Sequence, residues 1–579
     1  MDNPEIARTL EEVADVLEIQ NANPFRVRAY RNAVRTVETV TVPLRRWVEE
    51  GRALTDLPGI GKEMASHIQE MVETGTLGFR DELLAAVPRS LIELMRLPGL
   101  GPKKARKIWD DLQIGSVDEL EAAAKEGRIA ALPGFGAKSQ EKILAGIAEH
   151  RQRGGRFLLP QAERAVEPLL AYLREIPEVE RLEVAGSYRR RLETVGDVDL
   201  LAIASQPLPV MAGFRGYAQV DKILMAGDTR STIVLGSGLQ VDLRVVPPDC
   251  YGAALVYFTG SKEHNVKLRR RAVEQGLRIS EYGAFRVAEN GEIAADCVAG
   301  REEADVYAAV GLAWIPPELR EDHGEIEAAA AGRLPHLIRV EDLRGDLHMH
   351  STWSDGRNSI EEMVEACVAR GYEYMVISDH SKSLAMTGGL DAYRLRQQWL
   401  EIDEVRARHP EIRVLRAMEV DILGDGSLDL EDEMLAGLDL VLVSLHSRLD
   451  LPADQQTARV LRALEHPQVN IFCHPTARLI NRRKPSEFDL ELVLRRAAEL
   501  GVAVELNSSP SRLDLKDTHL RLARELGCKV VIDTDSHRTG ELDLMRYGVE
   551  QARRAGLGPQ DVLNTLPFEE FQAAIQRRM

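Results

Sequence analysis

The stretch Asp346-Leu-His348-Met-His350 ends a short apolar run with residue types that bind metal ions. Within residues 341–579, five more apolar runs end in Ser378-Asp379-His380, Met418-Glu419-Val420-Asp421, Ser444-Leu445-His446, Cys473-His474-Pro475 and Asp533-Thr534-Asp535-Ser536-His537. A seventh run, Val502-Ala-Val-Glu-Leu-Asn507, has the same form without a histidine. Seven such strands predict a barrel with a metal site at its C-terminal mouth, where barrel enzymes keep their chemistry. Helical stretches between the runs, at 359–370, 392–408 and 490–500, fit this parallel α/β pattern, which is typical of a metal-dependent hydrolase.

Length and composition limit the class of protein. The chain has 579 residues and is 44% hydrophobic, which suits about three or four domains. It has no apolar run of about 18 residues, so we expect no membrane-spanning helix. The start, Met1-Asp2-Asn3-Pro4-Glu5, lacks the basic and apolar parts of a signal peptide. The five cysteines are scattered without CxxC spacing, which favours a cytoplasmic protein over a disulfide framework.

The net charge of −18 at first argues against a nucleic-acid partner. The charge is uneven, with 23 basic against 24 acidic side chains in residues 1–156, 21 against 27 in 157–340, and 30 against 41 in 341–579. Much of the acidity therefore lies in the predicted barrel. The front of the chain is almost neutral, so any DNA contact there must come from local geometry.

One turn occurs three times near the front of the chain, as Leu57-Pro-Gly59-Ile-Gly61-Lys62, Leu97-Pro-Gly99-Leu-Gly101-Pro-Lys103 and Leu132-Pro-Gly134-Phe-Gly136-Ala-Lys138. Glycine tolerates the positive φ of a tight turn, and the free N–H groups at the helix start that follows attract phosphate. This is the helix-hairpin-helix pattern, which grips a DNA backbone without reading its sequence. One copy is equally compatible with a glycine turn in a helical bundle, but three copies with nearby lysines favour DNA binding.

Residues 157–320 carry three acidic residues on predicted strands of a mixed α/β region. The segment Val195-Gly-Asp197-Val-Asp199 opens one strand, and Leu239-Gln-Val-Asp242-Leu lies on another. Residues i and i+2 of a strand face the same side, so Asp197 and Asp199 point together. Asp242 interrupts an apolar alternation, where a carboxylate needs a partner. Three carboxylates on adjacent strands can hold two Mg²⁺ ions for phosphoryl transfer, whereas the Asp-x-Asp pair alone is also typical of a strand-end turn.

These acidic residues belong to a larger motif. The segment Gly186-Ser187-Tyr-Arg-Arg190, followed by Gly196-Asp197-Val-Asp199, resembles the family X DNA polymerases. The later Tyr257-Phe258-Thr-Gly260-Ser-Lys-Glu-His-Asn265 is similar to the segment of DNA polymerase beta that lines the nucleotide. The resemblance covers residues 1–320 and implies catalytic metal ligands at Asp197, Asp199 and Asp242, binding two Mg²⁺ or Mn²⁺ ions. It also implies triphosphate contacts by Ser187 and Arg190, a sugar-side wall of Tyr257, Phe258 and Gly260, and minor-groove contacts by Asn265 and Arg269. The alternatives are that Tyr257 and Phe258 are core residues and that Arg269 belongs to a solvated helix face.

Two positions depart from the family pattern. Arg191 stands where the family has glycine, so a bulky cation occupies a turn suited to positive φ. It could reshape the triphosphate pocket or add a phosphate contact. His67 stands where polymerase beta has the lysine that forms a Schiff base with deoxyribose phosphate. Because imidazole cannot form that imine, we expect no lyase activity of this type, although Lys62 could substitute.

The barrel segment resembles the PHP (polymerase and histidinol phosphatase) phosphoesterases, whose pattern opens with His348-x-His350 and Asp355 in Trp-Ser-Asp355-Gly. The resemblance implies up to three Mn²⁺, Zn²⁺ or Fe²⁺ ions, with Glu419 as the bridging carboxylate. Mixed imidazole and carboxylate ligands do not select among these metals. Cys473 is expected to be a buried strand cysteine. The implied ligands are His348, His350, Asp355, His380, Glu419, His446, His474, Asp535 and His537.

Together the motifs imply a multidomain α/β protein. We expect a helix-hairpin-helix region at 1–156, a mixed α+β nucleotidyltransferase palm with its nucleotide-binding subdomain at 157–320, a linker at 321–340, and a distorted seven-stranded (βα)7 barrel at 341–579. The implied function is gap-filling DNA synthesis in base excision repair, acting on gapped or primed DNA with dNTPs. The barrel would process 3′ ends as a 3′→5′ exonuclease, a 3′-phosphatase or an abasic-site nuclease. We expect a monomer in the cytoplasm, associated with the nucleoid.

Two rival functions stay open. The polymerase half could act only as a DNA clamp, and gap filling that survives Asp197→Ala would exclude synthesis by the predicted carboxylates. The barrel could be a structural module or a small-molecule phosphatase. If it is a phosphatase, His350→Ala would abolish hydrolysis of small phosphomonoesters alone. Fusion to three DNA-binding hairpins favours a DNA substrate.

Overall fold

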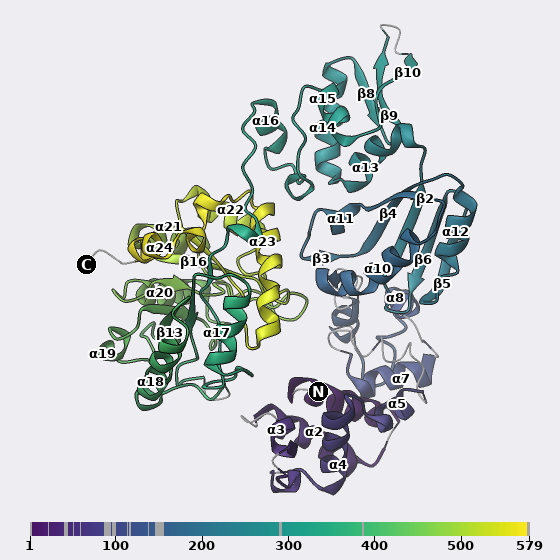
Figure 1. Ribbon diagram of the computed structural model, residues 1–579. Coiled ribbons are helices and arrows are strands. Elements are labelled where there is room, and N and C mark those ends of the chain that lie inside the picture. The colour runs from purple at the N-terminus through teal and green to yellow at the C-terminus, as the bar shows by residue number, and fades with distance from the viewer. Residues whose placement is uncertain are drawn as a thin grey trace. The chain divides into compact units, whose positions relative to one another are not determined.

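The structure is a computed structural model, and it divides into two compact units, Met1–Gly155 and Arg156–Met579 (Figure 1). No helix in the described part of the chain is long and apolar enough to cross a membrane. The predicted fold class is confirmed: a helical front, a mixed middle region and a seven-stranded parallel barrel. The described residues are 3–20, 22–39, 44–49, 51–57, 59–85, 94, 100–112, 114, 117–136, 138–144, 147, 156–288, 292–384 and 387–575.

The first unit is built from helices around two small cores. Leu10 of α1, Tyr30 of α2 and Ile68 of α4 are buried in one core, and Ile108 of α7 and Leu120 of α8 in the other. Since α4 and α7 are helices that glycine turns open, each core holds a hairpin in place. The helices whose bounds lie among the described residues include α1 (Asn3–Ile19), α2 (Pro24–Thr39), α3 (Leu44–Glu49), α4 (Lys62–Thr74), α5 (Gly78–Ala85), α7 (Pro102–Leu112) and α8 (Val117–Lys125).

The second unit begins with a five-stranded sheet of order β2-β4-β7-β6-β5, here called the palm. Helices α10 (Leu159–Arg174) and α12 (Pro207–Arg215) bury one face, while α13 (Tyr251–Thr259) packs on the other. Strands β4 and β7 are parallel, so their first residues lie at the same edge of the sheet. The strands are β2 (Val179–Val184), β4 (Asp197–Ala204), β5 (Val220–Ala226), β6 (Arg230–Leu235) and β7 (Gln240–Val245), with β1 (Phe157–Leu158) paired separately to β3 (Thr194–Val195).

After α13 the chain forms a smaller subdomain. It comprises α14 (Lys262–Glu274), α15 (Glu303–Ala309) and an antiparallel sheet of β8 (Leu277–Ser280), β9 (Gly283–Val287) and β10 (Ile293–Ala299). The expected helical connector contains α16 (Glu325–Ala330), whose Ile326 and Ala329 join the core of this subdomain. Glu325 Oε1 also lies 2.6 Å from Nδ1 of the buried His264. The connector is therefore packed on the subdomain, and the division into domains at 320/321 stays a prediction.

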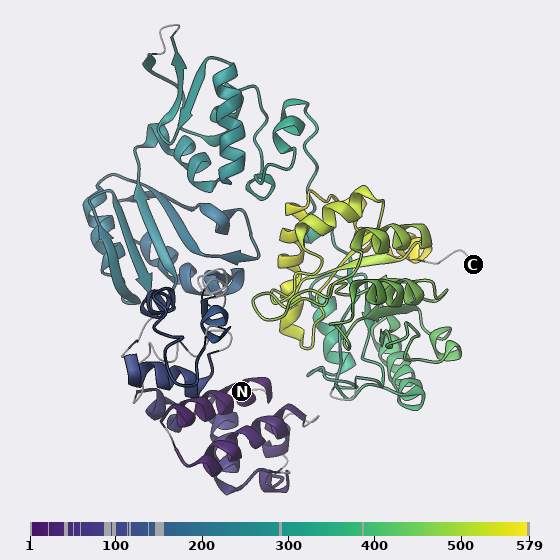
Figure 2. The same cartoon turned by 180° about the vertical axis from the view of Figure 1, so that it is seen from behind.

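The last part is a barrel of seven parallel strands in chain order, surrounded by helices (Figure 2). Every residue of β12, β14, β16 and β17 is buried, as expected for parallel strands covered by helices. A parallel bridge between Met349 and Ser536 brings the first and last strand ends together, so the barrel is nearly closed. The strands are β11 (Gly345–Asp346), β12 (Tyr374–Ile377), β13 (Arg413–Asp421), β14 (Leu440–Ser444), β15 (Ile471–Phe472), β16 (Ala503–Asn507) and β17 (Val530–Asp533).

The helices of the barrel follow its strands and begin at recognisable caps. Ser359 accepts from the backbone N–H of Glu362, whose carboxylate accepts from the N–H of Ser359, so a capping box starts α17. Asp391 and Asp489 cap α18 and α21 in the same way through one hydrogen bond each. The helices are α17 (Ile360–Ala369), α18 (Ala392–Arg408), α19 (Asp432–Leu435), α20 (Ala453–Leu464), α21 (Leu490–Leu500), α22 (Asp517–Glu525), α23 (Met545–Arg554) and α24 (Phe568–Ile575).

Candidate active sites

The three acidic residues of the palm meet at one edge of its sheet. Asp197 begins β4, and the parallel register pairs Asp199 with Asp242 of β7. Asp197 is exposed, Asp199 half-buried and Asp242 buried. Burial, together with the charges of Asp197 and Asp242, raises the pKa of Asp199 to about 6. Carboxylates crowded in this way fit divalent cations, which would relieve their mutual repulsion.

Neighbouring side chains fix the orientation of Asp242. Thr232 Oγ1 donates to its Oδ1 at 2.5 Å, and Gln240 Nε2 donates to its Oδ2 at 2.9 Å. Neither was predicted from the sequence. Gln240 had a signal, because it lies two residues before Asp242 on the same side of the strand. Thr232 comes opposite Asp242 only through the pairing of β6 with β7.

The residues predicted to bind triphosphate lie on a turn beside these carboxylates. α11 (Gly186–Arg189) begins at Gly186 with φ 63°, and a Cβ atom there would lie 2.7 Å from Oδ2 of Asp199. Only glycine tolerates both the φ and the close approach. Ser187 is half-buried on this turn, and Arg190 follows it. A Cβ atom at Gly260 would lie 3.0 Å from Nη1 of Arg190, so the predicted sugar-side segment adjoins the same turn.

The residues predicted to contact the sugar and the base pair gather where α13 ends and α14 begins. The rings of Tyr257 and Phe258 meet edge to face, with centroids 5.1 Å apart. Gly260 ends α13 with φ 74°. Asn265 Nδ2 donates to the carbonyl oxygen of Tyr257 at 2.7 Å, and Arg269 Nε donates to the carbonyl oxygen of Asn265 at 3.1 Å. Tyr257 and Arg269 also line a cavity of about 630 Å³. The structure therefore brings all five residues together.

The glycine turns of the first unit open helices as expected. Gly59 and Gly134 have φ values of 77° and 86°. The first backbone hydrogen bonds of the following helices have carbonyl acceptors at Gly61, Gly101 and Gly136. The side chain of Lys62 is exposed beside the first turn. Gly99 and the side chain of Lys103 lie outside the described residues.

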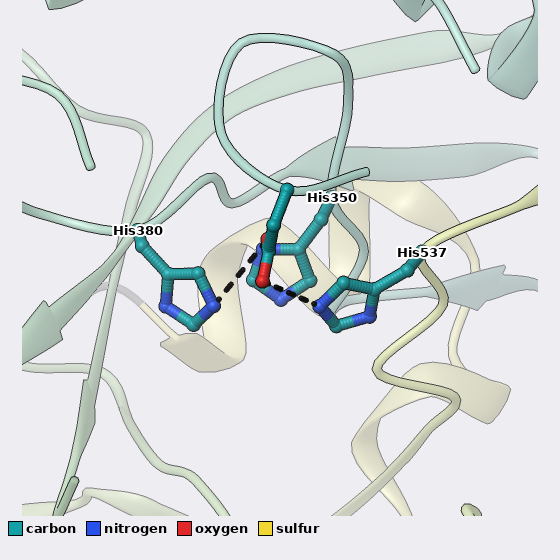
Figure 3. Close-up of side chains that lie close together, drawn as sticks. His350, His380 and His537 are labelled. Atoms are coloured by element: carbon teal, nitrogen blue, oxygen red, sulfur yellow. Dashed lines mark ion pairs between the residues drawn. The ribbon is translucent and has the colours of Figure 1, made fainter. Parts of the chain in front are cut away.

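The nine predicted ligands of the barrel converge at the C-terminal ends of its strands. Figure 3 shows the imidazoles of His350, His380 and His537 close together. The ring centroid of His350 lies 4.4 Å from that of His380 and 4.3 Å from that of His537. Asp355 lies among them, 3.6 Å from Nε2 of His380 and 3.4 Å from Nε2 of His537. These four side chains form one group that can hold a metal ion.

Glu419 of β13 is the centre of the barrel cluster. Although burial alone would raise its pKa, the surrounding imidazoles hold it well below its usual range. One shared carboxylate among several imidazoles is the arrangement expected of a bridging ligand. Its oxygens lie 2.8–3.6 Å from ring nitrogens of His348, His350, His380, His446 and His474.

The donor set fits divalent metal ions. Several buried polar atoms of the cluster have no hydrogen-bond partner among the residues that the structure describes, namely Nε2 of His348, Nδ1 of His350, His380 and His474, and Oε2 of Glu419. Buried polar atoms are rarely left unpaired, and imidazole nitrogens with carboxylate oxygens are ordinary ligands of Zn²⁺ and Mn²⁺. The clustered side chains can therefore hold divalent metal ions.

A second layer of carboxylates orients the histidines, and sequence reasoning assigned it no role. Oε1 of the buried Glu505 lies 2.5 Å from Nδ1 of His348, and Oδ1 of Asp421 lies 2.8 Å from Nδ1 of His446. A bond at Nδ1 leaves Nε2 for a metal ion. Both acids lie on strands that the sequence predicted to end in ligands, and this position could have indicated their role. Cys473 lies near the first pair, but burial raises the pKa of its thiol, as expected for a buried strand cysteine.

Comparisons with known families match four parts of the chain. Residues 1–77 match the helix-hairpin-helix domain, and residues 91–149 match the SAM-like helix-hairpin-helix tandem. Residues 254–321 match the DNA polymerase beta thumb, and residues 346–507 match the PHP domain. The matched ranges contain the three glycine turns, the Tyr257–Arg269 segment, and seven of the nine predicted barrel ligands, while Asp535 and His537 lie beyond the PHP match.

Individual relatives extend these matches. A protein of Syntrophotalea carbinolica named "Probable phosphatase" is 30% identical over 230 residues, which is 38% of this chain and 90% of that protein. A Bacillus subtilis (strain 168) protein named "DNA polymerase/3'-5' exonuclease PolX" is 38% identical over 579 residues, covering 100% of both chains. The chain therefore belongs to the family X DNA polymerases that carry a C-terminal PHP domain.

Proposed function

We propose that this protein fills gaps in DNA with its palm and trims 3′ ends with its barrel. The observation that carries the proposal is that two separate clusters of candidate metal-binding side chains follow, along the chain, a region with three glycine turns of the helix-hairpin-helix pattern. The full-length relative named DNA polymerase/3'-5' exonuclease PolX supports both activities. Base excision repair, a monomeric state and a place near the nucleoid belong to the same proposal, as does the four-part division of the chain.

In the palm, Asp197, Asp199 and Asp242 would hold two Mg²⁺ or Mn²⁺ ions. Such ions stabilise the attacking and leaving oxygens of phosphoryl transfer. Ser187 and Arg190 would bind the triphosphate, since an arginine fork reaches two phosphate oxygens. The rings of Tyr257 and Phe258, with Gly260, would form the sugar-side wall, and Asn265 and Arg269 would contact the minor groove of the new pair.

In the barrel, the nine clustered side chains would hold up to three Mn²⁺, Zn²⁺ or Fe²⁺ ions. Such ions lower the pKa of water and neutralise phosphate charge. Glu419 would bridge them, and Glu505 and Asp421 would keep His348 and His446 in the ligating tautomer. Arg512 lies 3.5 Å from Asp535 and would attract a phosphodiester to the site.

The hairpins would hold the DNA backbone through the helix starts after Gly59–Gly61, Gly99–Gly101 and Gly134–Gly136, helped by Lys62 and Lys103. His67 lies on α4 with its Nδ1 3.0 Å from the hydroxyl oxygen of Tyr30. The absence of Schiff-base lyase activity stays a prediction, and borohydride trapping on a 5′-deoxyribose-phosphate substrate tests it. An adduct that survives Lys62→Ala would contradict it.

A second candidate for the barrel is hydrolysis of small phosphomonoesters. Relatives named "Probable phosphatase" match 230 to 232 residues of this chain, or 38% of its length, which is close to the length of the barrel segment. In that case His350→Ala would abolish release of phosphate from a small ester but leave shortening of DNA unchanged. Loss of both reactions in this variant would instead assign DNA to the same site.

The decisive experiment is a gel assay on 5′-labelled DNA with a one-nucleotide gap, in Mn²⁺ or Mg²⁺, with and without dNTPs. Wild type is run beside Asp199→Ala and His446→Ala. We expect Asp199→Ala to lose extension alone and His446→Ala to lose 3′ shortening alone. Shortening that survives His446→Ala would refute the barrel assignment, and extension that survives Asp199→Ala would refute the palm assignment.

A further inference from the structure

Arg191, one of the two residues that depart from the family pattern, is part of a largely buried ion-pair cluster within the second unit. Its φ is 58°, a value that glycine adopts without strain. Its Nη2 lies 2.6 Å from Oε1 of Glu163 in α10 and 2.5 Å from Oε1 of Glu550 in α23. The side chains of Arg191, Glu163 and Glu550 are 17%, 9% and 20% exposed. The guanidinium is therefore bound by two carboxylates of the protein itself.

The same cluster ties α23 to the palm at further points. Tyr547 Oη and Arg546 Nη2 each donate to Oε2 of Glu163 at 2.6 Å. Arg554, at the other end of α23, donates from Nη1 to the carbonyl oxygen of Arg190 at 2.7 Å. Its side chain is only 6% exposed and also pairs with Asp517 of α22 at 2.7 Å. Helix α23 thus contacts both Arg190 and Arg191. These two residues end the segment 186–191, here called the nucleotide turn.

Along the chain, α23 closely follows two predicted ligands of the barrel site. The chain runs from Asp535 and His537 through a short 3-10 helix, Thr539–Leu544, directly into α23. Tyr547 of α23 is buried in the core of the palm together with Leu513 of the barrel. The turn that lies against Asp199 is therefore anchored to α23, the helix that follows the last strand of the barrel.

The energetics favour a positioning role for these contacts. Two cations, Arg191 and Arg546, face two carboxylates, Glu163 and Glu550, so the cluster is neutral as a whole. Removing one partner leaves an uncompensated charge in a largely buried place. Because a non-glycine residue is strained at positive φ, the ion pairs also hold the backbone of Arg191 in a conformation that it would otherwise leave.

We propose that Arg191 and Glu550 are positioning residues of the polymerase, through which the PHP domain holds the nucleotide turn ready for the triphosphate. The inference rests on the proposed binding of triphosphate by Ser187 and Arg190. A loosened turn binds nucleotide less well in the ground state and the transition state alike. The loss therefore appears in KM for dNTP and leaves kcat unchanged.

The test measures steady-state filling of a one-nucleotide gap by the full-length protein. Glu550→Gln, which keeps the side-chain shape, and Arg191→Met are each expected to raise KM for dNTP about tenfold, or about 1.4 kcal/mol, with kcat and 3′ shortening kept within about twofold. Arg553→Gln is the matched control. Arg553 lies in the same helix but pairs with Glu318 at 2.8 Å and with the carbonyl oxygen of Ile338. Its KM is expected to equal that of wild type.

Two further variants separate positioning from general stability. Arg191→Lys keeps the charge and is expected to restore most of the nucleotide affinity. The double variant Arg191→Met/Glu550→Gln is expected to be no worse than Arg191→Met, because both changes remove one interaction. Wild-type KM in a folded Glu550→Gln protein would overturn the inference, as would an equal rise in KM for Arg553→Gln. A wild-type protein that does not extend the primer would instead refute the proposed polymerase.

Discussion

The palm site and the barrel site differ in how much of the ligand set the protein supplies. In the palm, three carboxylates stand at the edge of a sheet, Asp197 is exposed, and burial with like charge raises the pKa of Asp199 to about 6. In the barrel, nine side chains converge, and imidazoles hold the pKa of Glu419 well below its usual range. The palm is a net negative cluster that needs ions and substrate to complete it. The barrel already balances its charges and is preorganised.

The strongest test of this difference is removal of one palm carboxylate. Asp199→Asn is expected to lower the rate of gap filling by about 10³-fold or more, because residues that act as a unit fail together. Exonuclease activity is expected to stay within about twofold, since the barrel has its own ligands. Both rates are read from one gel with 5′-labelled DNA. A parallel loss of exonuclease activity would mean that the two sites are not independent.

The corresponding change in the barrel is Glu419→Gln. The neutral amide leaves five imidazoles without their shared anion, so we expect the metal content to fall and exonuclease activity to drop about 10²-fold to 10³-fold. Gap filling is expected to persist. Metal content is measured by elemental analysis beside both activity assays. If Glu419→Gln keeps its full metal content and full exonuclease activity, Glu419 is not a bridging ligand.

The second layer of the barrel predicts a smaller effect. Glu505→Gln keeps the shape of the side chain but loses the charge that orients His348, which should weaken metal affinity by about 10-fold to 100-fold. Competition with a metal-binding dye measures the affinity directly. Glu525→Gln, an exposed change in the same barrel, is the control. Equal affinity in both variants would show that His348 does not need the carboxylate.

Metal removal should lower the thermal stability of the protein through the ions bound in the barrel. Ions bound at about 100 times their Kd stabilise the folded state by about 2.7 kcal/mol, which shifts the Tm of a barrel of this size by about 5–10 °C. We therefore expect chelation to lower the barrel's Tm by that amount. The same treatment of Glu419→Gln is expected to change Tm little. An equal shift in both proteins would place the stabilising ions elsewhere.

The sequence by itself determined the elements and most of the two sites. Strands that end in ligands, the i and i+2 spacing of Asp197 and Asp199, and glycines that accept positive φ are all local properties, so they can be read without the fold. Eight of the nine predicted barrel ligands stand at the ends of apolar runs, and parallel strands end at one mouth of a barrel. The ninth, Asp355, was predicted from the resemblance to the PHP family. The seven parallel strands are confirmed, while the ligand roles of the nine side chains stay a prediction.

Only the tertiary structure decided which partners meet across the chain. Glu505 reaches His348 across 157 positions, and Arg191 reaches Glu550 across 359. No local sequence pattern encodes such pairs, because they form only when distant helices and strands pack together and exclude water. The same burial decides their energy, since an ion pair that is weak on a surface becomes costly to break inside. The sequence marked Arg191 as unusual, but only the fold gave its guanidinium two carboxylates to bind.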